Sequence, residues 1–278
     1  MRILDDYSLE MTAKNVPDLE AARELIPAGT RINVTYLGNE DLPMRLTASK
    51  AVKDFGFRPV PHISARRLES QEQLEEFLGA LRDNGTVESV FAVGGDPETP
   101  MGPYDNSAEL IESGVLPSFG VQDVSIAGHP EGHPDVSNEI LWEALDAKYK
   151  TLKEQKLPGT ILTQFSFDVD AVLTWIEAVR ARGIDLPIRV GLPGPAGIKR
   201  LLGFARRFGV ASSAGIAKKY GFSITNLLGT AGPDNLIKDL ESRYDPAIHG
   251  VVKVHFYTFN GMTATSEWIR DFQAQQHS

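Results

Sequence analysis

The stretch SIAGHPEGHPD, residues 125–135, places two histidines four positions apart and follows each with a proline. Imidazoles beside carboxylates can bind a divalent metal ion, transfer protons or line the rim of a ligand pocket. Two histidines at this spacing chelate a metal when a helix brings them onto one face. Pro130 and Pro134, however, push the residues before them out of the α region. We therefore expect His129 and His133 to lie in an extended or turning loop, which disfavours a metal site.

Polar residues also stand at the ends of other β-rich runs in the chain. They are Glu10, Thr35, Tyr36, His62, Asp96, Gln164, Tyr257 and Asn260. A single threonine, tyrosine or histidine at a strand end is most often a structural residue with satisfied hydrogen bonds. If the strand ends converge, the histidines and Asp96 could also ligate zinc or another divalent ion, which is the metal alternative. The function of these residues therefore depends on whether the fold brings them to one rim.

The elements that would position these residues alternate between strand and helix patterns. The β-rich runs occupy residues 7–11, 31–38, 57–64, 89–95, 122–129, 159–167, 187–193 and 251–259. Apolar stripes of helical period lie between them, as in residues 70–85 and 168–183. Asp168 is the expected N-cap of the second of these helices. The stretch 211–245 is longer than one helix of this kind, and we expect two helices there.

Eight strands, each followed by a helix, favour a (β/α)8 TIM barrel over the alternative of an open, doubly wound sheet. The chain has 278 residues, and a typical barrel has about 250. No linker or shift in composition divides the chain, so we expect one domain over residues 1–278. Barrel enzymes build their sites at the C-terminal ends of the strands. This fold would therefore bring the polar residues to one mouth.

The composition and the missing motifs narrow the function classes. A net charge of −9 disfavours a nucleic acid or an anionic membrane surface as a partner. The chain has no cysteine and therefore no thiolate zinc site or cysteine nucleophile. No apolar run approaches the roughly 20 residues that span a bilayer. The G-x-S-x-G motif of hydrolases and the G-x-G-x-x-G motif of dinucleotide-binding folds are both missing. We expect a soluble, cytoplasmic protein that binds a small molecule.

Seven short motifs, taken in order, resemble the methylenetetrahydrofolate reductases. They are S-L-E-M at 8–11, V-T-Y at 34–36, P-H-I-S at 61–64, A-V-G-G-D at 92–96, S-I-A-G-H-P-E-G-H-P at 125–134, T-Q-F-S-F-D at 163–168 and H-F-Y-T-F-N at 255–260. The resemblance covers nearly the whole chain and corresponds to the catalytic barrel without the regulatory domain of the eukaryotic enzymes. It implies a (β/α)8 fold and a folate substrate, and, because the family forms dimers and tetramers, a possible homo-oligomer.

The resemblance also implies roles for individual residues. Glu10 matches the glutamate that acts as general acid while the methylene bridge of the folate opens to an iminium ion. Asp96 matches the aspartate that faces the pterin and the flavin, where it could stabilise the developing cation. Gln164 matches the glutamine that pairs with the pterin. Phe204 matches the phenylalanine that stacks on the aminobenzoyl ring or the nicotinamide cofactor, although a helix-core role fits its sequence equally well.

The family resemblance further implies a flavin-binding rim and a reductant. The rim residues would be Thr35, His62, Gly95, Asp96, His129 and His133, which would contact FAD. Hydride would pass from NADH or NADPH to FAD and then to the methylene carbon, yielding 5-methyltetrahydrofolate.

Several departures from the family pattern fall on the cofactor contacts. Gly94 stands where an arginine usually helps to hold FAD, His129 replaces a tyrosine, and Gly261 replaces an arginine that helps to bind the substrate. The helix cations that would meet the pyrophosphate do not align securely, and Lys148, Lys150 and Lys153 are the candidates. Two alternatives therefore stay open: a flavin-independent reductase that uses NADH directly, and a tetrahydrofolate-binding protein of one-carbon or methyl transfer.

Overall fold

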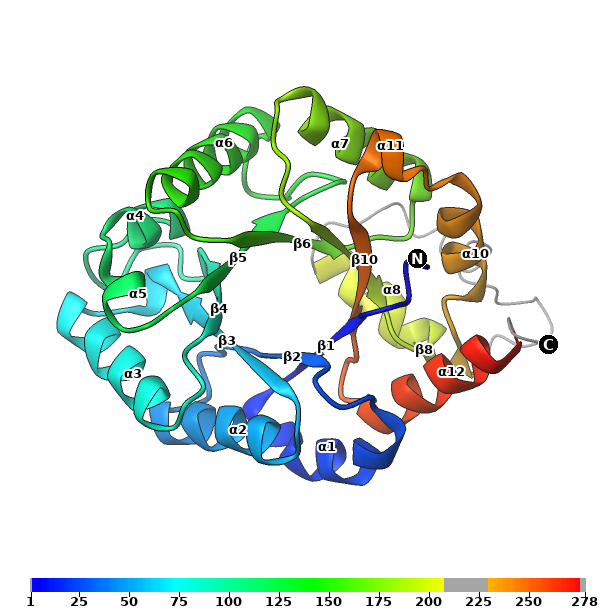
Figure 1. The fold of residues 1–278 in the computed structure, drawn as a ribbon, viewed down its shortest axis with the longest axis horizontal. Helices are drawn as coiled ribbons and strands as arrows, with labels where there is room; N and C mark the ends of the chain where they lie inside the picture. The colour runs from blue at the N-terminus through cyan, green and yellow to red at the C-terminus, as the bar shows by residue number, and fades with distance from the viewer. Residues whose placement is uncertain (1, 208–229, 276–278) are drawn as a thin grey trace.

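Eight parallel strands close into a barrel in the computed structural model, which describes residues 2–207 and 230–275 (Figure 1). The strands are β1 (Ser8–Met11), β2 (Arg31–Val34), β3 (Arg58–Ser64), β4 (Ser89–Val93), β5 (Asp123–Gly128), β6 (Gly159–Phe165), β7 (Ile188–Pro193) and β10 (Val252–Tyr257). Their order around the barrel is β1-β10-β7-β6-β5-β4-β3-β2. This arrangement confirms the predicted (β/α)8 TIM barrel and the eight predicted β-rich runs, and it rules out the open sheet.

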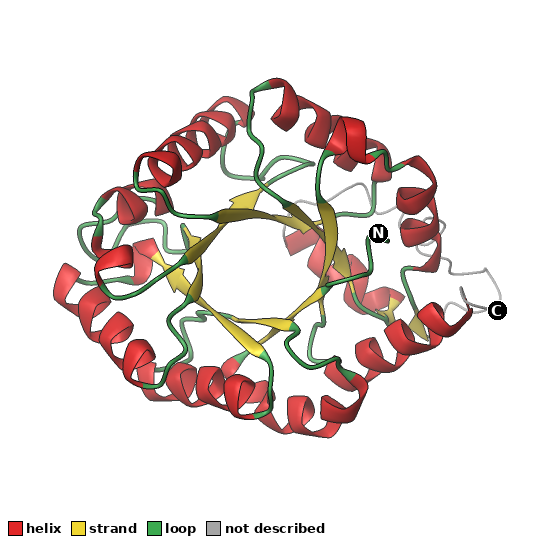
Figure 2. Ribbon diagram, viewed as in Figure 1, coloured by secondary structure: helices red, strands yellow, loops and turns green. Residues whose placement is uncertain are grey.

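Helices surround the barrel as an outer ring (Figure 2). They are α1 (Val16–Ala22), α2 (Leu42–Asp54), α3 (Gln71–Asp83), α4 (Ser107–Glu112), α5 (Val115–Ser118), α6 (Asn138–Glu154), α7 (Val169–Ala181), α8 (Ile198–Arg207), α10 (Asp234–Arg243), α11 (Pro246–His249) and α12 (Met262–Gln275). Short 3-10 turns occur at η1 (Ala13–Asn15), η2 (Arg23–Leu25) and η3 (Ala65–Arg67), and β8 (Ala196–Gly197) pairs with β9 (Thr230–Ala231). In the described ranges, no helix has the length and apolar character to cross a membrane.

The predicted helix boundaries follow from side-chain caps. Ser70 accepts a hydrogen bond from the Gln73 backbone and begins α3. Asp168 accepts bonds from two backbone N–H groups at the start of α7, which confirms it as the N-cap. Of the two helices expected in residues 211–245, α10 is present, and the first part of that stretch lies outside the described residues.

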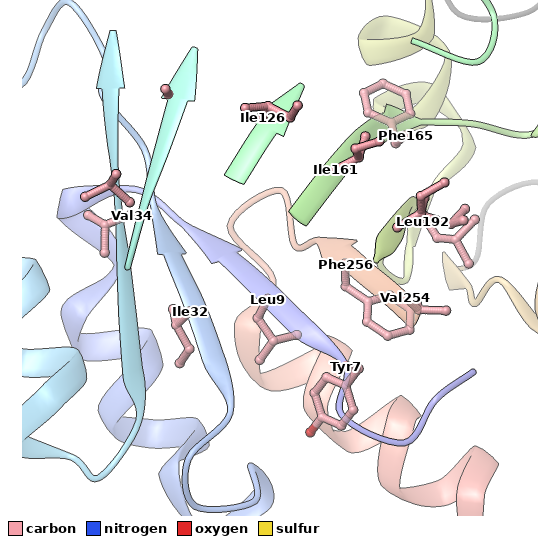
Figure 3. Packing of buried hydrophobic residues seen from close by; sticks show 14 of the residues in the cluster. Tyr7, Leu9, Ile32, Val34, Ile126, Ile161, Phe165, Leu192, Val254 and Phe256 are labelled. Atoms are coloured by element: carbon pink, nitrogen blue, oxygen red, sulfur yellow. The ribbon is translucent and has the colours of Figure 1, made fainter. Parts of the chain in front are cut away.

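The two faces of each barrel strand differ in character because successive side chains point to opposite sides. Leu9, Ile32, Val254 and Phe256 belong to the apolar cluster that packs under the helices (Figure 3). The alternate positions face the barrel interior, so Glu10 lies on the inner face of β1. The pattern places polar groups inside the barrel and the hydrophobic core between the strands and the helices.

The barrel interior is closed below the mouth. Val60, Phe91 and Leu162 form a separate buried cluster on the inner faces of β3, β4 and β6. At the N-terminal end of the strands, Arg31 of β2 forms an ion pair with Asp123 of β5. The polar groups at the C-terminal strand ends are therefore the ones that a ligand entering the barrel would meet.

Candidate active site

Glu10 lies at the centre of a buried polar cluster in the barrel mouth. Its Oε2 atom is 3.9 Å from Nε2 of His62 on β3 and 3.9 Å from Nε2 of His255 on β10. The Glu10 side chain is 20% exposed, whereas the two histidine side chains are 9% and 0% exposed. Three residues that are far apart in the chain are thus brought together by three strands, as the barrel prediction required.

Burial shifts the pKa of each member of this cluster. Desolvation raises the pKa of Glu10, and the nearby His62 opposes that shift in part. Desolvation lowers the pKa of His62 to about 4 and that of His255 to about 3. Both imidazoles are therefore neutral near pH 7, and Glu10 retains its proton to a higher pH than an exposed carboxyl group does. A carboxyl group in this state can act as a general acid.

Several buried polar atoms at the same mouth have no hydrogen-bond partner within the described residues. They are Thr35 Oγ1, His62 Nε2, Ser64 Oγ and His255 Nε2. An unsatisfied buried polar group costs about 1–3 kcal/mol, and such groups in native proteins commonly bond a ligand or an ordered water. Thr35, at the end of β2, and His62, on β3, are both predicted rim residues.

The predicted residues Gly95 and Asp96 lie in the loop after β4, at the edge of the mouth. Gly95 has φ of +100°, and a Cβ atom there would clash with Ser64 Oγ, so this position requires glycine. Asp96 Oδ1 accepts hydrogen bonds from Arg67 Nε at 2.9 Å and Nη2 at 2.6 Å. The Asp96 side chain is 72% exposed. The structure therefore holds Asp96 in a rim ion pair rather than against Glu10.

Gln164 lies at an irregular point of β6. The register between β6 and β7 shifts between Leu162 and Phe165, and Gln164 Oε1 accepts a hydrogen bond from the Phe165 backbone at 3.0 Å. Strand irregularities of this kind are common beside active sites, where they redirect a side chain. Beside it, the Tyr257 hydroxyl donates to the Thr163 carbonyl at 3.0 Å.

An aromatic wall forms one side of the mouth. Phe204 of α8 stacks on Phe259 with ring centroids 4.1 Å apart and planes at 16°. Phe259 also contacts Phe165 and Tyr257 through their rings. Phe259 and Asn260 both have positive φ, at 50° and 62°, which is uncommon for non-glycine residues and marks a constrained loop. Phe204 is therefore part of an aromatic stack at the rim as well as being packed against the core.

The loop that carries His129 and His133 turns without forming a helix, as predicted from its prolines. The two rings meet edge to face with centroids 5.7 Å apart. Burial lowers the pKa of His129 to about 4, with further contributions from Lys148 and His133. No group of three or more metal-ligating side chains occurs in the part of the chain that the structure describes.

A pocket of about 480 Å³ lies beside this loop, between the end of β5, α6 and α7. His129 and Glu131 line one side, and Trp142 and Trp175 line the other. The two tryptophan rings stack with centroids 5.8 Å apart. The loop therefore borders a concave region of its own, whereas His62 contacts Glu10.

Three residues of the cluster and the wall were not singled out as site residues from the sequence alone: Ser8, His255 and Phe259. Ser8 and Glu10 lie two positions apart on β1, and His255 and Tyr257 lie two positions apart on β10. The alternation of side chains along a strand could have placed each pair on one face. Nothing in the sequence indicated that Phe259 would stack on Phe204.

The protein is a (β/α)8 barrel with a cluster of polar residues at the C-terminal ends of its strands, where enzymes of this fold have their active sites. Among solved structures, dihydropteroate synthase from Thermus thermophilus has a similar fold, with a TM-score of 0.50, 16% identity and coverage of 98% of this chain and 94% of that chain. At that identity, the similarity concerns the fold alone.

Sequence comparison is more specific. Residues 12–272 match the family model of methylenetetrahydrofolate reductase, so the chain belongs to this family. The 5,10-methylenetetrahydrofolate reductase of Pectobacterium carotovorum is 27% identical over 239 residues, covering 82% of this chain and 75% of that protein. Methylenetetrahydrofolate reductase 2 of Saccharomyces cerevisiae is 32% identical over 127 residues, covering 43% of this chain and 20% of that protein.

Proposed function

We propose that this chain reduces 5,10-methylenetetrahydrofolate to 5-methyltetrahydrofolate with NADH or NADPH as the source of hydride. The observation that carries the proposal is the Glu10 carboxyl group, held in a desolvated barrel mouth among polar atoms that have no hydrogen-bond partner in the described part of the chain. Family membership and the names of the relatives support the same reaction.

Glu10 supplies the proton in this proposal. It protonates the amine nitrogen of the folate as the methylene bridge opens, which leaves an iminium ion. Addition of one hydride to the iminium carbon then gives the methyl product, so the reaction consumes one proton and one hydride. The raised pKa lets Glu10 keep its proton to a higher pH than an exposed carboxyl group would.

The other predicted residues would bind and orient the folate. Gln164 lies at the irregular point of β6, and its amide can pair with the pterin edge. Asp96 would place negative charge near the developing cation, and its ion pair with Arg67 would have to open or rotate for direct contact. Phe204 and Phe259 offer a flat aromatic surface for the aminobenzoyl ring or for nicotinamide.

The described residues fit the ring end of FAD better than its phosphate end. Thr35, His62 and Ser64 offer polar atoms that have no partner in residues 2–207 and 230–275, and such atoms suit the edge of a flavin ring as they suit a pterin. When bound, FAD would accept hydride from the nicotinamide and deliver it to the folate. With Gly95 and the loop histidines, these groups form the cofactor rim that we propose.

Two of the three helix cations expected at the FAD pyrophosphate form ion pairs with carboxylates, and the third is buried. Lys150 lies 3.8 Å from Glu154, and Lys153 lies 3.8 Å from Asp185. Lys148 is 5% exposed, and burial lowers its pKa to about 8. These observations favour a second candidate, in which NADH passes hydride directly to the folate without FAD.

Two measurements test these proposals. Glu10→Gln should lower kcat for NADH-dependent folate reduction by about 10²- to 10⁴-fold while leaving folate affinity within a few-fold, because the amide cannot donate the proton. Unaltered turnover in this variant would contradict the acid role.

The absorbance of the purified protein at about 370 and 450 nm separates the two cofactor candidates. A yellow protein supports FAD, and a colourless protein that still reduces the folate with NADH supports direct transfer.

A further inference from the structure

His62 and His255 approach the same oxygen of Glu10 from different strands. His255 lies on β10, which pairs directly with β1, and His62 lies on β3, two strands away on the other side. Each Nε2 atom is 3.9 Å from Glu10 Oε2, and neither has a hydrogen-bond partner among the described residues. A distance of 3.9 Å is too long for a direct hydrogen bond, which spans about 2.7–3.2 Å. Both imidazoles could therefore form a hydrogen bond with Glu10 after a small shift. They could also be linked to it through one bridging water or ligand atom.

Ser8 determines which nitrogen of His255 carries the proton. Its hydroxyl lies 2.9 Å from His255 Nδ1, and both side chains are fully buried. If Nδ1 donated to the hydroxyl, the Ser8 O–H group would be left without an acceptor in a buried site. Donation from Ser8 to Nδ1 satisfies both groups and leaves the proton on Nε2. The N–H group of His255 therefore points toward Glu10.

We propose that His255, fixed in this tautomer by Ser8, and His62 are positioning residues for Glu10. They hold the carboxyl group in the mouth and, with His255 as donor, stabilise the carboxylate that remains after the proton has passed to the folate. This inference rests on the proposed acid role of Glu10 and adds residues to it.

The charges around the cluster agree with neutral rather than cationic partners. The titratable groups that face it are His62 from β3, His255 and Tyr257 from β10, and Arg189 from β7, which disfavours a positive charge on His255. A cationic histidine beside Glu10 would favour the ionised carboxylate before the reaction. Neutral imidazoles leave the proton on Glu10 and still offer a hydrogen bond to the product carboxylate.

A matched pair of variants at position 255 tests this role. His255→Asn retains an oxygen acceptor for Ser8 but has no group that reaches Glu10, whereas His255→Gln can present an amide N–H near the position of Nε2. We expect His255→Asn to lower kcat by about 10-fold or more, with the KM for folate within about threefold, and His255→Gln to recover part of the loss.

The pH profile separates positioning from a loss of structure. Activity that depends on a protonated Glu10 falls as pH rises through the pKa of that carboxyl group. Loss of the His255 N–H group, which would donate a hydrogen bond to the carboxylate, raises that pKa. In His255→Asn, the basic limb of the kcat profile should therefore move to higher pH by about half a unit or more. Ser8→Ala should move it in the same direction by less. His249→Asn is a matched control, because this buried histidine on α11 also accepts a hydrogen bond through Nδ1, in its case from the Asp245 backbone, and lies outside the mouth.

The outcomes distinguish this inference from the proposed function. If the wild-type protein does not reduce the folate, or if Glu10→Gln is fully active, the proposed function fails and the inference fails with it. If Glu10→Gln is inactive but His255→Asn and Ser8→Ala keep the wild-type kcat and basic limb, the positioning role alone is overturned. Circular dichroism checks folding. If His255→Asn does not fold, the basic limb of the kcat profile of Ser8→Ala tests the positioning role.

Discussion

Two pairs of histidines lie near carboxylates in this barrel, and they differ in how they are built. His129 and His133 are four positions apart in one loop, beside Glu131 and Asp135. His62 and His255 are nearly two hundred positions apart and meet only because β3 and β10 belong to the same closed barrel. The loop pair is conspicuous in the sequence, whereas the strand pair flanks the carboxyl group of Glu10, whose pKa is raised by burial.

The two pairs also differ in their surroundings. His62 and His255 are both buried on the inner face of the barrel, against Glu10. His129 is half-buried beside a pocket between α6 and α7, and His133 is exposed. A titratable side chain is desolvated only when other elements of the fold surround it, and a local loop motif does not supply those elements by itself. The loop pair therefore borders a pocket between helices, whereas the strand pair lies against the buried carboxyl group of Glu10.

The largest expected difference between the pairs is in kcat. His62→Asn should lower kcat for folate reduction by about 10-fold, because the shorter side chain no longer reaches Glu10. His133→Asn should change kcat by less than about threefold, since its ring contacts His129 rather than Glu10. Steady-state kinetics with saturating folate and NADH measure both values. Equal losses in the two variants would contradict the distinction between the cluster and the loop.

The comparison also shows how far the sequence could predict the structure. Period-2 and helical patterns predicted all eight strands and the boundaries of α3 and α7, because these depend on local side-chain alternation and caps. The strand-end rule predicted that Glu10 and His62 would lie near each other. Rotamer-dependent contacts were not predictable, and the stack of Phe204 on Phe259 is an example. The pairing of Asp96 with Arg67 is another, because a rim carboxylate can choose among several partners.

The buried histidines and Glu10 also differ in how they change the stability of the folded protein as pH falls. The pKa of His129 falls to about 4 and that of His255 to about 3, below the ordinary 6.5, because burial disfavours their charged forms. Between those values and 6.5 the unfolded chain binds more protons than the folded one, so these groups lower the stability as pH falls through this window. The raised pKa of Glu10 acts in the opposite sense, since the folded state then binds the extra proton.

Replacement of a histidine removes its share of this acid sensitivity. We expect the loss of unfolding free energy between pH 6.5 and pH 4.5 to shrink by about 1–2 kcal/mol in His129→Asn. Urea unfolding at several pH values measures the difference. An unchanged slope in His129→Asn would show that this imidazole is solvated in the folded protein.

The smallest expected effect concerns the rim ion pair between Arg67 and Asp96. Arg67→Met should lower the free energy of unfolding by less than about 1 kcal/mol, because the carboxylate is largely exposed and such pairs contribute little. The same change releases Asp96, so the KM for folate should change by about two- to threefold while kcat stays near the wild-type value. Thermal unfolding and steady-state kinetics of Arg67→Met and Asp96→Asn provide the comparison. A fall in kcat for Arg67→Met as large as that for His62→Asn would place the ion pair within the same functional unit as Glu10, and the separation of the rim from the buried cluster would then have to be abandoned.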